Sequence, residues 1–419
     1  MSYSKEMLEA ISEGELIDAQ EKFEQAMILD TPEEKYQLAA YLFELGFLEE
    51  SEQLYQNLLA DFPEEEGIKI SLAEIAIEND DIGRAQTLLN DILPSSDVYV
   101  QSLLTQADLY QQLDIPEVSQ QKLREAKLIL PDEPLIDLAL AELFFSIEDY
   151  NDAVPIYEEL LVAEDSGELA STISITERLG VALSRMGNFE EAVMYLEQAI
   201  ERDETAEALF QLALTYYQLE ELERTTELLQ HIKELNEEFL QVYYPLAQVL
   251  SDQGLFEEAA EVAQIGIDKN PYDLNLYHVA SIVAYQLGQS ENAKQQLMQA
   301  IALDDSDFSK LKLAELLLKE DDYDDVIDLV DQLENSEQGH AQWYLAQAYN
   351  GLEEYEQAKI AFNLAKIELA DEPGFIRDYG LFLREEGQLD ETKKWLTHYL
   401  TFVPDDIEVV ELLSSIGGD

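Results

Sequence analysis

The sequence predicts an all-α solenoid of about twelve helix-turn-helix repeats, followed by one C-terminal capping helix. The first observation is a repeated phrase: GNFEEAVMYLEQAIERD at 187–203 returns as GLFEEAAEVAQIGIDKNP at 254–271. The second is that this pattern recurs along the chain with a period of about 34 residues, which is the signature of a repeat architecture. The third is that small residues return at two fixed positions of the period. The expected repeats start near residues 1, 32, 66, 100, 134, 173, 206, 240, 274, 307, 339 and 373.

Two apolar stripes within each period predict the two helices of a repeat. Positions 4, 7, 8 and 11 follow the i, i+3, i+4, i+7 spacing of one helix face, and positions 20, 24, 27 and 28 form the stripe of a second helix. Position 24 is mostly a large apolar residue. Position 8 is small from the second repeat onward: Ala39, Ala73, Ala107, Ala141, Gly180, Ala213, Ala247, Ser281, Ala314, Ala346 and Gly380.

Position 20 is small or at most β-branched, and with position 8 it predicts two backbones in close approach. It is occupied by Ala19, Ser51, Ala85, Ser119, Ala153, Ala192, Thr225, Ala259, Ala293, Val326, Ala358 and Thr392. Glycine between the two stripes predicts the end of the first helix and a chain reversal. It is found as Gly14, Gly46, Gly187, Gly254, Gly288 and Gly387. Endings such as LADFP at 59–63 and DKNP at 268–271 predict the end of the second helix.

These residues resemble the tetratricopeptide-repeat family over nearly the whole chain. The family pattern is clearest in ERLGVALSRMGNFEEAVMYLEQAI at 177–200 and WYLAQAYNGLEEYEQAKIAFNLA at 343–365. In the second segment its diagnostic positions are held by Leu345, Ala346, Tyr349, Ala358, Phe362 and Ala365. The chain departs from the pattern in usually having Ala for Gly at position 8. The resemblance implies a bacterial cytosolic protein with a right-handed superhelix, and a concave groove, lined by the first helices, that binds peptides or partner proteins.

One interval between repeats is longer than the period of about 34 residues, because 39 residues separate the starts at 134 and 173. The excess lies in 162–172, which is interpreted either as a longer loop or as a hinge. The hinge interpretation divides the chain into a block of five repeats at 1–172 and a block of seven at 173–406. Pro155, beyond the first turn of its helix, is expected to favour a kink. The segment 407–419 is expected to be a capping helix that docks through Ile407, Val410 and Leu413.

The charge and the hydrophobic content of the chain argue against some classes of partner. The 419 residues carry 91 Asp and Glu against 24 Lys and Arg, a formal net charge of -67. Such a surface repels phosphate backbones and anionic lipids, so we expect neither a nucleic-acid nor a membrane partner. Hydrophobic residues make up 47% of the chain, enough for a folded core. The absence of cysteine, of a secretory signal and of an apolar run approaching ~20 residues predicts a cytoplasmic protein.

No catalytic constellation is found in the sequence, so we expect no enzyme, no cofactor and no metal. The motifs of zinc proteases, P-loops, dinucleotide folds and nucleophile elbows are absent. The histidines, His231, His278, His340 and His398, fall in different repeats at different positions and form no ligand set. The acidic segment 320–331 lacks the glycine and glutamate of a calcium loop.

The groove that the resemblance implies is comparatively neutral and rich in aromatic residues. Seven bases fall in groove-facing slots: Lys5, Arg178, Arg185, Lys312, Lys319, Arg377 and Arg384. The aromatic residues in these slots suit a peptide surface. The candidates for partner binding are Phe210, Tyr217, Tyr244, Tyr285, Trp343 and Tyr344. The alternative is that some of these rings pack between neighbouring helices.

Arginines complete the candidate set. Arg178 with Arg185, and Arg377 with Arg384, are i, i+7 pairs, and none has an acid at its i±3 or i±4 positions. Guanidinium groups hold carboxylates with bidentate bonds, so one hypothesis is a clamp for a partner's carboxylates. The alternative is an ion pair across repeats, such as Arg178 with Glu142 or Glu207.

The sequence thus favours a non-catalytic scaffold or adaptor that binds a protein segment in its groove. A second hypothesis is that the acidic convex surface binds basic proteins, as a nucleic-acid mimic or a chaperone-like sink. A third is a structural spacer that associates with itself.

Overall fold

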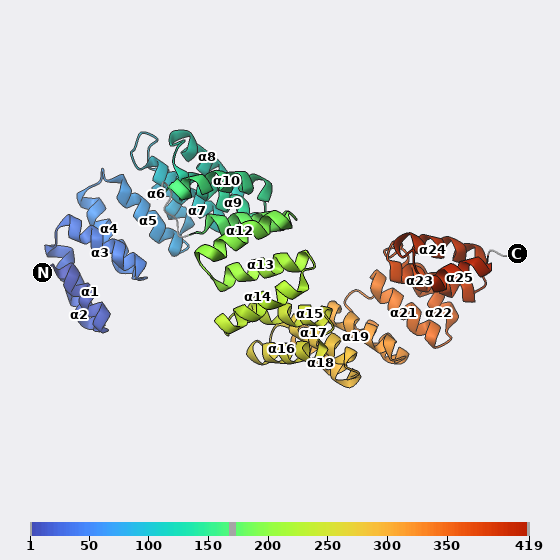
Figure 1. Ribbon diagram of the computed structural model, residues 1–419. Helices are drawn as coiled ribbons and strands as arrows, with labels where there is room; N and C mark the ends of the chain where they lie inside the picture. Colours follow the sequence, from blue (N-terminus) through green and yellow to red (C-terminus); the bar gives the residue numbers. More distant parts are fainter. Residues whose placement is uncertain (1, 167–172, 417–419) are drawn as a thin grey trace. The chain divides into compact units, whose positions relative to one another are not determined.

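The computed structural model describes residues 2–166 and 173–416, and within these ranges the regular elements are all helices (Figure 1). In chain order the α-helices are α1 (Tyr3–Glu13), α2 (Leu16–Leu29), α3 (Pro32–Glu44), α4 (Leu48–Asp61), α5 (Glu66–Glu78), α6 (Ile82–Asn90), α7 (Tyr99–Gln112), α8 (Pro116–Ile129), α9 (Pro134–Ser146), α10 (Tyr150–Ser166), α11 (Ile175–Arg185), α12 (Phe189–Arg202), α13 (Ala206–Gln218), α14 (Leu222–Leu235), α15 (Tyr243–Asp252), α16 (Phe256–Lys269), α17 (Leu274–Gln286), α18 (Ser290–Leu303), α19 (Asp307–Lys319), α20 (Tyr323–Val330), α21 (Gly339–Gly351), α22 (Tyr355–Ala365), α23 (Pro373–Glu385), α24 (Leu389–Phe402) and α25 (Ile407–Ile416). A single 3-10 turn, η1 (Leu240–Val242), precedes α15.

The helices form twelve consecutive pairs with α25 after the last one, which confirms the predicted solenoid. The odd-numbered helices from α1 to α23 begin within three residues of the predicted repeat starts. The chain divides into two compact units, Met1–Gln211 and Leu212–Asp419. Within each unit, paired helices pack against each other, and a second helix packs against the next first helix, as α4 does on α5 and α18 on α19.

The small residues predicted at positions 8 and 20 are buried in every repeat where they were identified. They lie where the two helices of a pair approach most closely. At Gly180, even one added Cβ would lie 2.7 Å from Cγ of Leu196 on the partner helix, and Gly380 faces Leu396 in the same way. A larger side chain at these points would force the helices apart, which explains the restriction to small residues.

A continuous core joins the repeats on either side of the predicted boundary at 172–173. Tyr157 and Leu160 of α10 are buried in the same cluster as Ile175 and Leu179 of α11. The helix α10 continues through Pro155 to Ser166. Residues 167–172, most of the proposed hinge segment, lie outside the described residues. The division into blocks 1–172 and 173–406 therefore stays a prediction.

The capping helix is present as α25, but its predicted docking face is wrong in part. Val409 is the residue that is buried, at 1% exposed, while Ile407 and Val410 are 71% and 42% exposed. Leu413 does pack against the core, as does Leu412. The register is set from the N-terminus of the helix, where the Asp406 carboxylate accepts a bond from the backbone N–H of Val409 at 3.2 Å. This bond rotates Val409 inward.

The turn between paired helices needs a left-handed residue in all twelve repeats, although only six have glycine there. The six predicted glycines have φ between 71° and 84°. The same position holds an acidic residue with φ between 56° and 62° in the other six: Asp80, Asp114, Glu148, Glu220, Asp321 and Glu353. A side chain in this conformation crowds the following carbonyl group, so these six turns carry a conformational cost.

Replacing Glu353 with glycine is therefore expected to stabilise the protein. Relief of the left-handed strain, less the extra entropy that glycine gives the unfolded chain, should raise the free energy of unfolding by about 0.5–1 kcal/mol. Gly387→Ala is the matched reverse change, because an added Cβ there would have open space around it and only backbone strain is introduced. Urea denaturation measures both; equal stability of wild type and both variants would contradict the assignment.

We propose that the segment 162–172 is the first site of limited proteolysis, because its sequence contains Asp165, Ser166 and Gly167, polar and small residues of the kind at which proteases cut first. The shared core of α10 and α11 should keep the two fragments together after the cut. Gel filtration of the nicked protein is expected to show co-elution, followed by separation in urea. Early cuts spread evenly among the inter-repeat turns would argue against this site.

Candidate partner-binding groove

The first helices of the unit Leu212–Asp419 line a groove that contains three hollows. We name them by the helices that contribute most of their walls: the α17–α19 hollow, the α21–α23 hollow and the α23–α25 hollow. Their volumes are about 270, 290 and 400 Å³. Each takes side chains from successive odd-numbered helices. Leu297 of α18 also lines the first hollow, and Tyr323 of α20 and Phe362 of α22 also line the second.

The α17–α19 hollow is lined by two lysines that share one carboxylate. Glu315 lies 2.9 Å from Nζ of Lys319 and 3.5 Å from Nζ of Lys312. Partial burial alone would raise the pKa of Glu315, but the hydrogen bond from Lys319 and the charges of both lysines outweigh it and hold the pKa below its usual value. The three side chains therefore carry a net positive charge on a strongly negative molecule.

An apolar wall stands beside these lysines. Ile282 is 46% exposed, while Leu316 beneath it is buried. Nζ of Lys319 lies over the Tyr285 ring, 5.6 Å from the ring centroid. His278 shares a hydrogen bond of 3.0 Å with Ser309, and burial together with the charge of Lys312 lowers its pKa. The hollow thus offers cationic donors next to exposed apolar surface.

The α21–α23 hollow has the opposite chemistry, because acceptors line it. Asp378, Glu385, Gln347 and Asn350 contribute to its walls. The Oδ1 atom of Asn350 is buried and has no donor among the described residues. Burial raises the pKa of Asp378, although the Trp343 Nε1–H that donates to it at 3.0 Å and the charge of Arg377 lower it. A donor or a cation would satisfy both groups.

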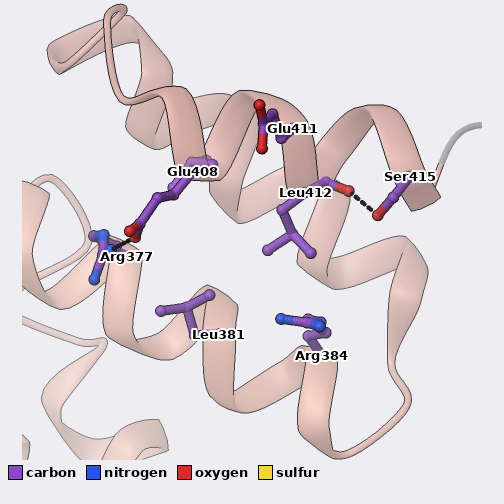
Figure 2. A pocket seen from close by; sticks show the side chains of 8 residues that line it. Arg377, Leu381, Arg384, Glu408, Glu411, Leu412 and Ser415 are labelled. Atoms are coloured by element: carbon purple, nitrogen blue, oxygen red, sulfur yellow. Dashed lines mark hydrogen bonds and ion pairs between the residues drawn. The ribbon is translucent and has the colours of Figure 1, made fainter.

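The α23–α25 hollow contains the second predicted arginine pair (Figure 2). Arg377 is bound by two acids that follow it: its Nε lies 3.3 Å from Asp406 and its Nη2 lies 3.0 Å from Glu408. Arg384 lies two turns further along α23, is exposed, and makes no hydrogen bond or ion pair with any residue in the described part of the chain. Leu381 lies between them.

The first predicted arginine pair lies in the other unit, and only one of its two arginines has a bonding partner in the part of the chain that the structure describes. Arg178 forms the predicted ion pair across repeats, with Nη2 at 3.2 Å from Glu142. Its guanidinium also lies 4.8 Å from the centroid of the Phe145 ring. Glu142 in turn accepts a bond of 2.6 Å from the Tyr157 hydroxyl. Arg185 is exposed and has no hydrogen bond or ion pair with the residues that the structure describes.

The predicted aromatic residues differ in how much surface they present. Tyr344 is only 9% exposed and belongs to the core, which leaves it little surface for a partner. Tyr285 and Trp343 are half-buried beside the hollows, and Phe210 and Tyr244 are half-buried on α13 and α15. The Tyr217 hydroxyl donates to Asp252 at 2.7 Å, and burial and this bond raise its pKa to about 12.

Sequence reasoning had placed Lys312 and Lys319 in groove slots but had not selected them as site residues. It had likewise placed Asp378 and Glu385 in groove slots without selecting them, and it missed Asn350. One signal was available: Lys312 with Lys319, and Asp378 with Glu385, are i, i+7 pairs like the arginines. The lysine pair was not selected because only arginines were considered as a clamp for carboxylates. The acidic pair was not selected because acids are abundant along the whole chain.

The described residues lack a membrane-spanning helix and a cluster of metal ligands. None of the helices in 2–166 and 173–416 is long and apolar enough to cross a membrane. Within the same ranges, no group of three or more histidine, aspartate or glutamate side chains is arranged to hold a metal ion.

Comparisons with known proteins place the chain among repeat proteins. The family profile described as "YpiA-like, C-terminal tetratricopeptide repeats" matches residues 340–406, and "YpiA-like, tetratricopeptide repeats" matches 111–165. General tetratricopeptide-repeat profiles match 42–107 and 274–307, and that of anaphase-promoting complex subunit 3 matches 185–264. The TPR repeat-containing protein YpiA of Bacillus subtilis is 33% identical over 387 residues, which cover 92% of this chain and 91% of the relative.

Solved structures with similar helical arrangements include Cut9 in the APC/C hetero-tetramer Cut9-Hcn1 and yeast Tom70. The Cut9-Hcn1 chain is 13% identical with a TM-score of 0.47, covering 98% of this chain and 95% of that one. The Tom70 chain is 14% identical with a TM-score of 0.48, covering 99% and 94%.

The contacts of the first arginine pair predict unequal effects on stability. Arg178→Gln should lower the free energy of unfolding by about 0.5–1 kcal/mol, because it loses a partly exposed ion pair and a ring contact. Arg185→Gln should leave stability unchanged. A double-mutant cycle of Arg178→Gln with Glu142→Gln measures the coupling directly. Zero coupling between the two positions would be inconsistent with the ion pair.

Proposed function

The chain belongs to the YpiA-like family of bacterial tetratricopeptide-repeat proteins, and on that premise we propose that it is a non-catalytic scaffold. Repeat solenoids present extended surfaces for protein partners. The proposal is that this chain binds an extended segment of a partner protein in the groove lined by α17, α19, α21 and α23. The cytoplasmic location expected from the sequence stays a prediction.

One observation supports this groove above the other surfaces. Lys312 and Lys319 are held around a single carboxylate beside the exposed side chain of Ile282. The two lysines and their shared acid keep a net positive charge on a chain whose formal charge is -67. A partner's carboxylate could bind both, and an apolar neighbour could cover Ile282. Half-exposed aromatic rings such as Tyr285 add a rigid contact surface.

A second candidate function is the binding of a basic protein by the acidic convex surface. The excess of 91 Asp and Glu over 24 Lys and Arg supports it, because such a surface attracts a cationic partner. Ionic strength separates the two functions, because ~0.5 M salt screens exposed charges far more than partly buried ones.

The proposed function is tested by affinity capture with the intact protein. Lys312→Gln combined with Lys319→Gln is expected to lose at least nine-tenths of the captured partner, a tenfold effect that corresponds to about 1.4 kcal/mol. The matched control is Lys393→Gln with Lys394→Gln on the second helix α24, which changes the net charge equally. Circular dichroism and thermal melting verify that both variants are folded.

Two results would contradict the groove as the binding surface. In one, the groove variant captures the partner as the wild type does. In the other, both variants lose it equally and the loss follows salt concentration, which would favour the acidic surface instead.

A further inference from the structure

Charged side chains of one helix in this groove are sorted by sign into two neighbouring hollows. On α23, Asp378 and Glu385 line the hollow shared with α21, whereas Arg377 and Arg384 line the hollow shared with α25. Leu381 lies between the two pairs and lines both hollows (Figure 2). Residues seven apart stand on one helix face two turns apart, so each pair presents its charge along the full height of the groove.

The α17–α19 hollow continues the alternation. Lys312 and Lys319 are again seven residues apart, on α19, and Glu315 between them neutralises only one. From α17 to α25 the hollows are therefore lined by two lysines with one shared acid, by acceptors, and by two arginines together with Glu408 and Glu411, of which Glu408 is paired with Arg377. Each has a group whose bonding is incomplete: the lysines share one acid, Asn350 Oδ1 has no donor among the described residues, and Arg384 has no acid bound within them.

We infer that this groove selects an extended partner segment whose charges alternate in the order acid, base, acid from α17 to α25. The inference rests on the proposed function and specifies its ligand. The first acid, with an apolar residue beside it, binds Lys312 and Lys319 and covers Ile282. The base donates to Asp378, Glu385 and Asn350. The second acid binds Arg384.

The long-range field of the protein favours this pattern over a segment of one sign. A purely acidic segment would be repelled by the net charge of -67 before it reached the lysines. A purely basic segment would meet Lys312 and Lys319 at one end of the groove and Arg384 at the other. A nearly neutral alternating segment avoids the repulsion, and its charges act at contact distance, within the ~8 Å over which salt screens them.

Helix spacing sets the expected separation of the charges. Packed helices lie about 8–10 Å apart, and an extended chain advances about 3.3 Å per residue, so one repeat corresponds to about three residues. The first acid and the base are two helix spacings apart, or roughly six residues, and the base and the second acid roughly three residues.

The test uses the intact protein and capped synthetic peptides of about ten residues with this spacing. The probe has Glu-Leu, then Arg, then Glu, in a Gly-Ser background, and carries a fluorophore for anisotropy. A scrambled peptide has the same composition with the charges out of order, and an inverted peptide has the sign of every charge exchanged. We expect the probe to bind at least tenfold more tightly than either.

Charge exchange then assigns each contact. Lys312→Glu with Lys319→Glu should weaken the probe at least tenfold, and replacing the first Glu of the probe with Arg should restore the loss. Arg384→Glu should do the same with the last Glu. The control Lys393→Glu with Lys394→Glu on α24 should leave the affinity within twofold. If a glutamate variant does not fold, the corresponding glutamine variant must still weaken the probe.

Equal binding of the probe and the scrambled peptide would overturn the inference, because net composition and not order would decide affinity. So would failure of the exchanged peptide to recover binding, or no detectable binding of the probe. The two proposals fail separately. Partner capture that is lost in the Lys312→Gln, Lys319→Gln variant would keep the groove as the binding surface even where no charge order is selected.

Discussion

The close approach of two helix backbones in each pair is the constraint on which the rest of the structure depends. It requires a small residue at two fixed positions in nearly every repeat, and at Gly180 and Gly380 it leaves no room for a single added carbon atom. Because the pairs are closely packed and uniform, one pair stacks on the next and the first helices lie in succession. The hollows of the groove are therefore a consequence of the same packing, and their chemistry depends on which residues the first helices present.

The fold could be predicted almost completely because the sequence pattern of one helix pair recurs in every repeat. A helix pair that is ambiguous in one repeat is settled by the others. The expected start of α19 at 307 is confirmed although Lys310 occupies a position of the predicted apolar stripe. What escaped prediction was decided by local geometry. An acidic residue with φ of about 60° at Glu148 or Asp321 has no sequence signal when glycine is the expected residue. The inward face of α25 was misjudged because Asp406 sets its register.

The groove was harder to predict than the fold, because a slot in a repeat says which way a side chain faces and not what stands opposite it. Arg178 and Arg377 looked free of acids on their own helices. Arg178 is bound by Glu142 of the preceding repeat, and Arg377 by Asp406 and Glu408 beside and within the capping helix. Lys319 has an acid four residues before it, and the structure shows that this acid is shared with Lys312. Pairing across helices decides which charges remain available, and it depends on three-dimensional neighbours that a single sequence does not list.

Placement of a partner on one face of the solenoid is the central claim, and site-specific photo-cross-linking in the native cell tests it most directly. A photoreactive amino acid replaces Ile282 on α17 or, in the matched protein, Met298 on α18 of the same repeat; both side chains are substantially exposed. The account predicts one discrete cross-linked partner at position 282 and none at position 298. The same partner at 298, with nothing at 282, would place the binding surface on the second helices and contradict the account.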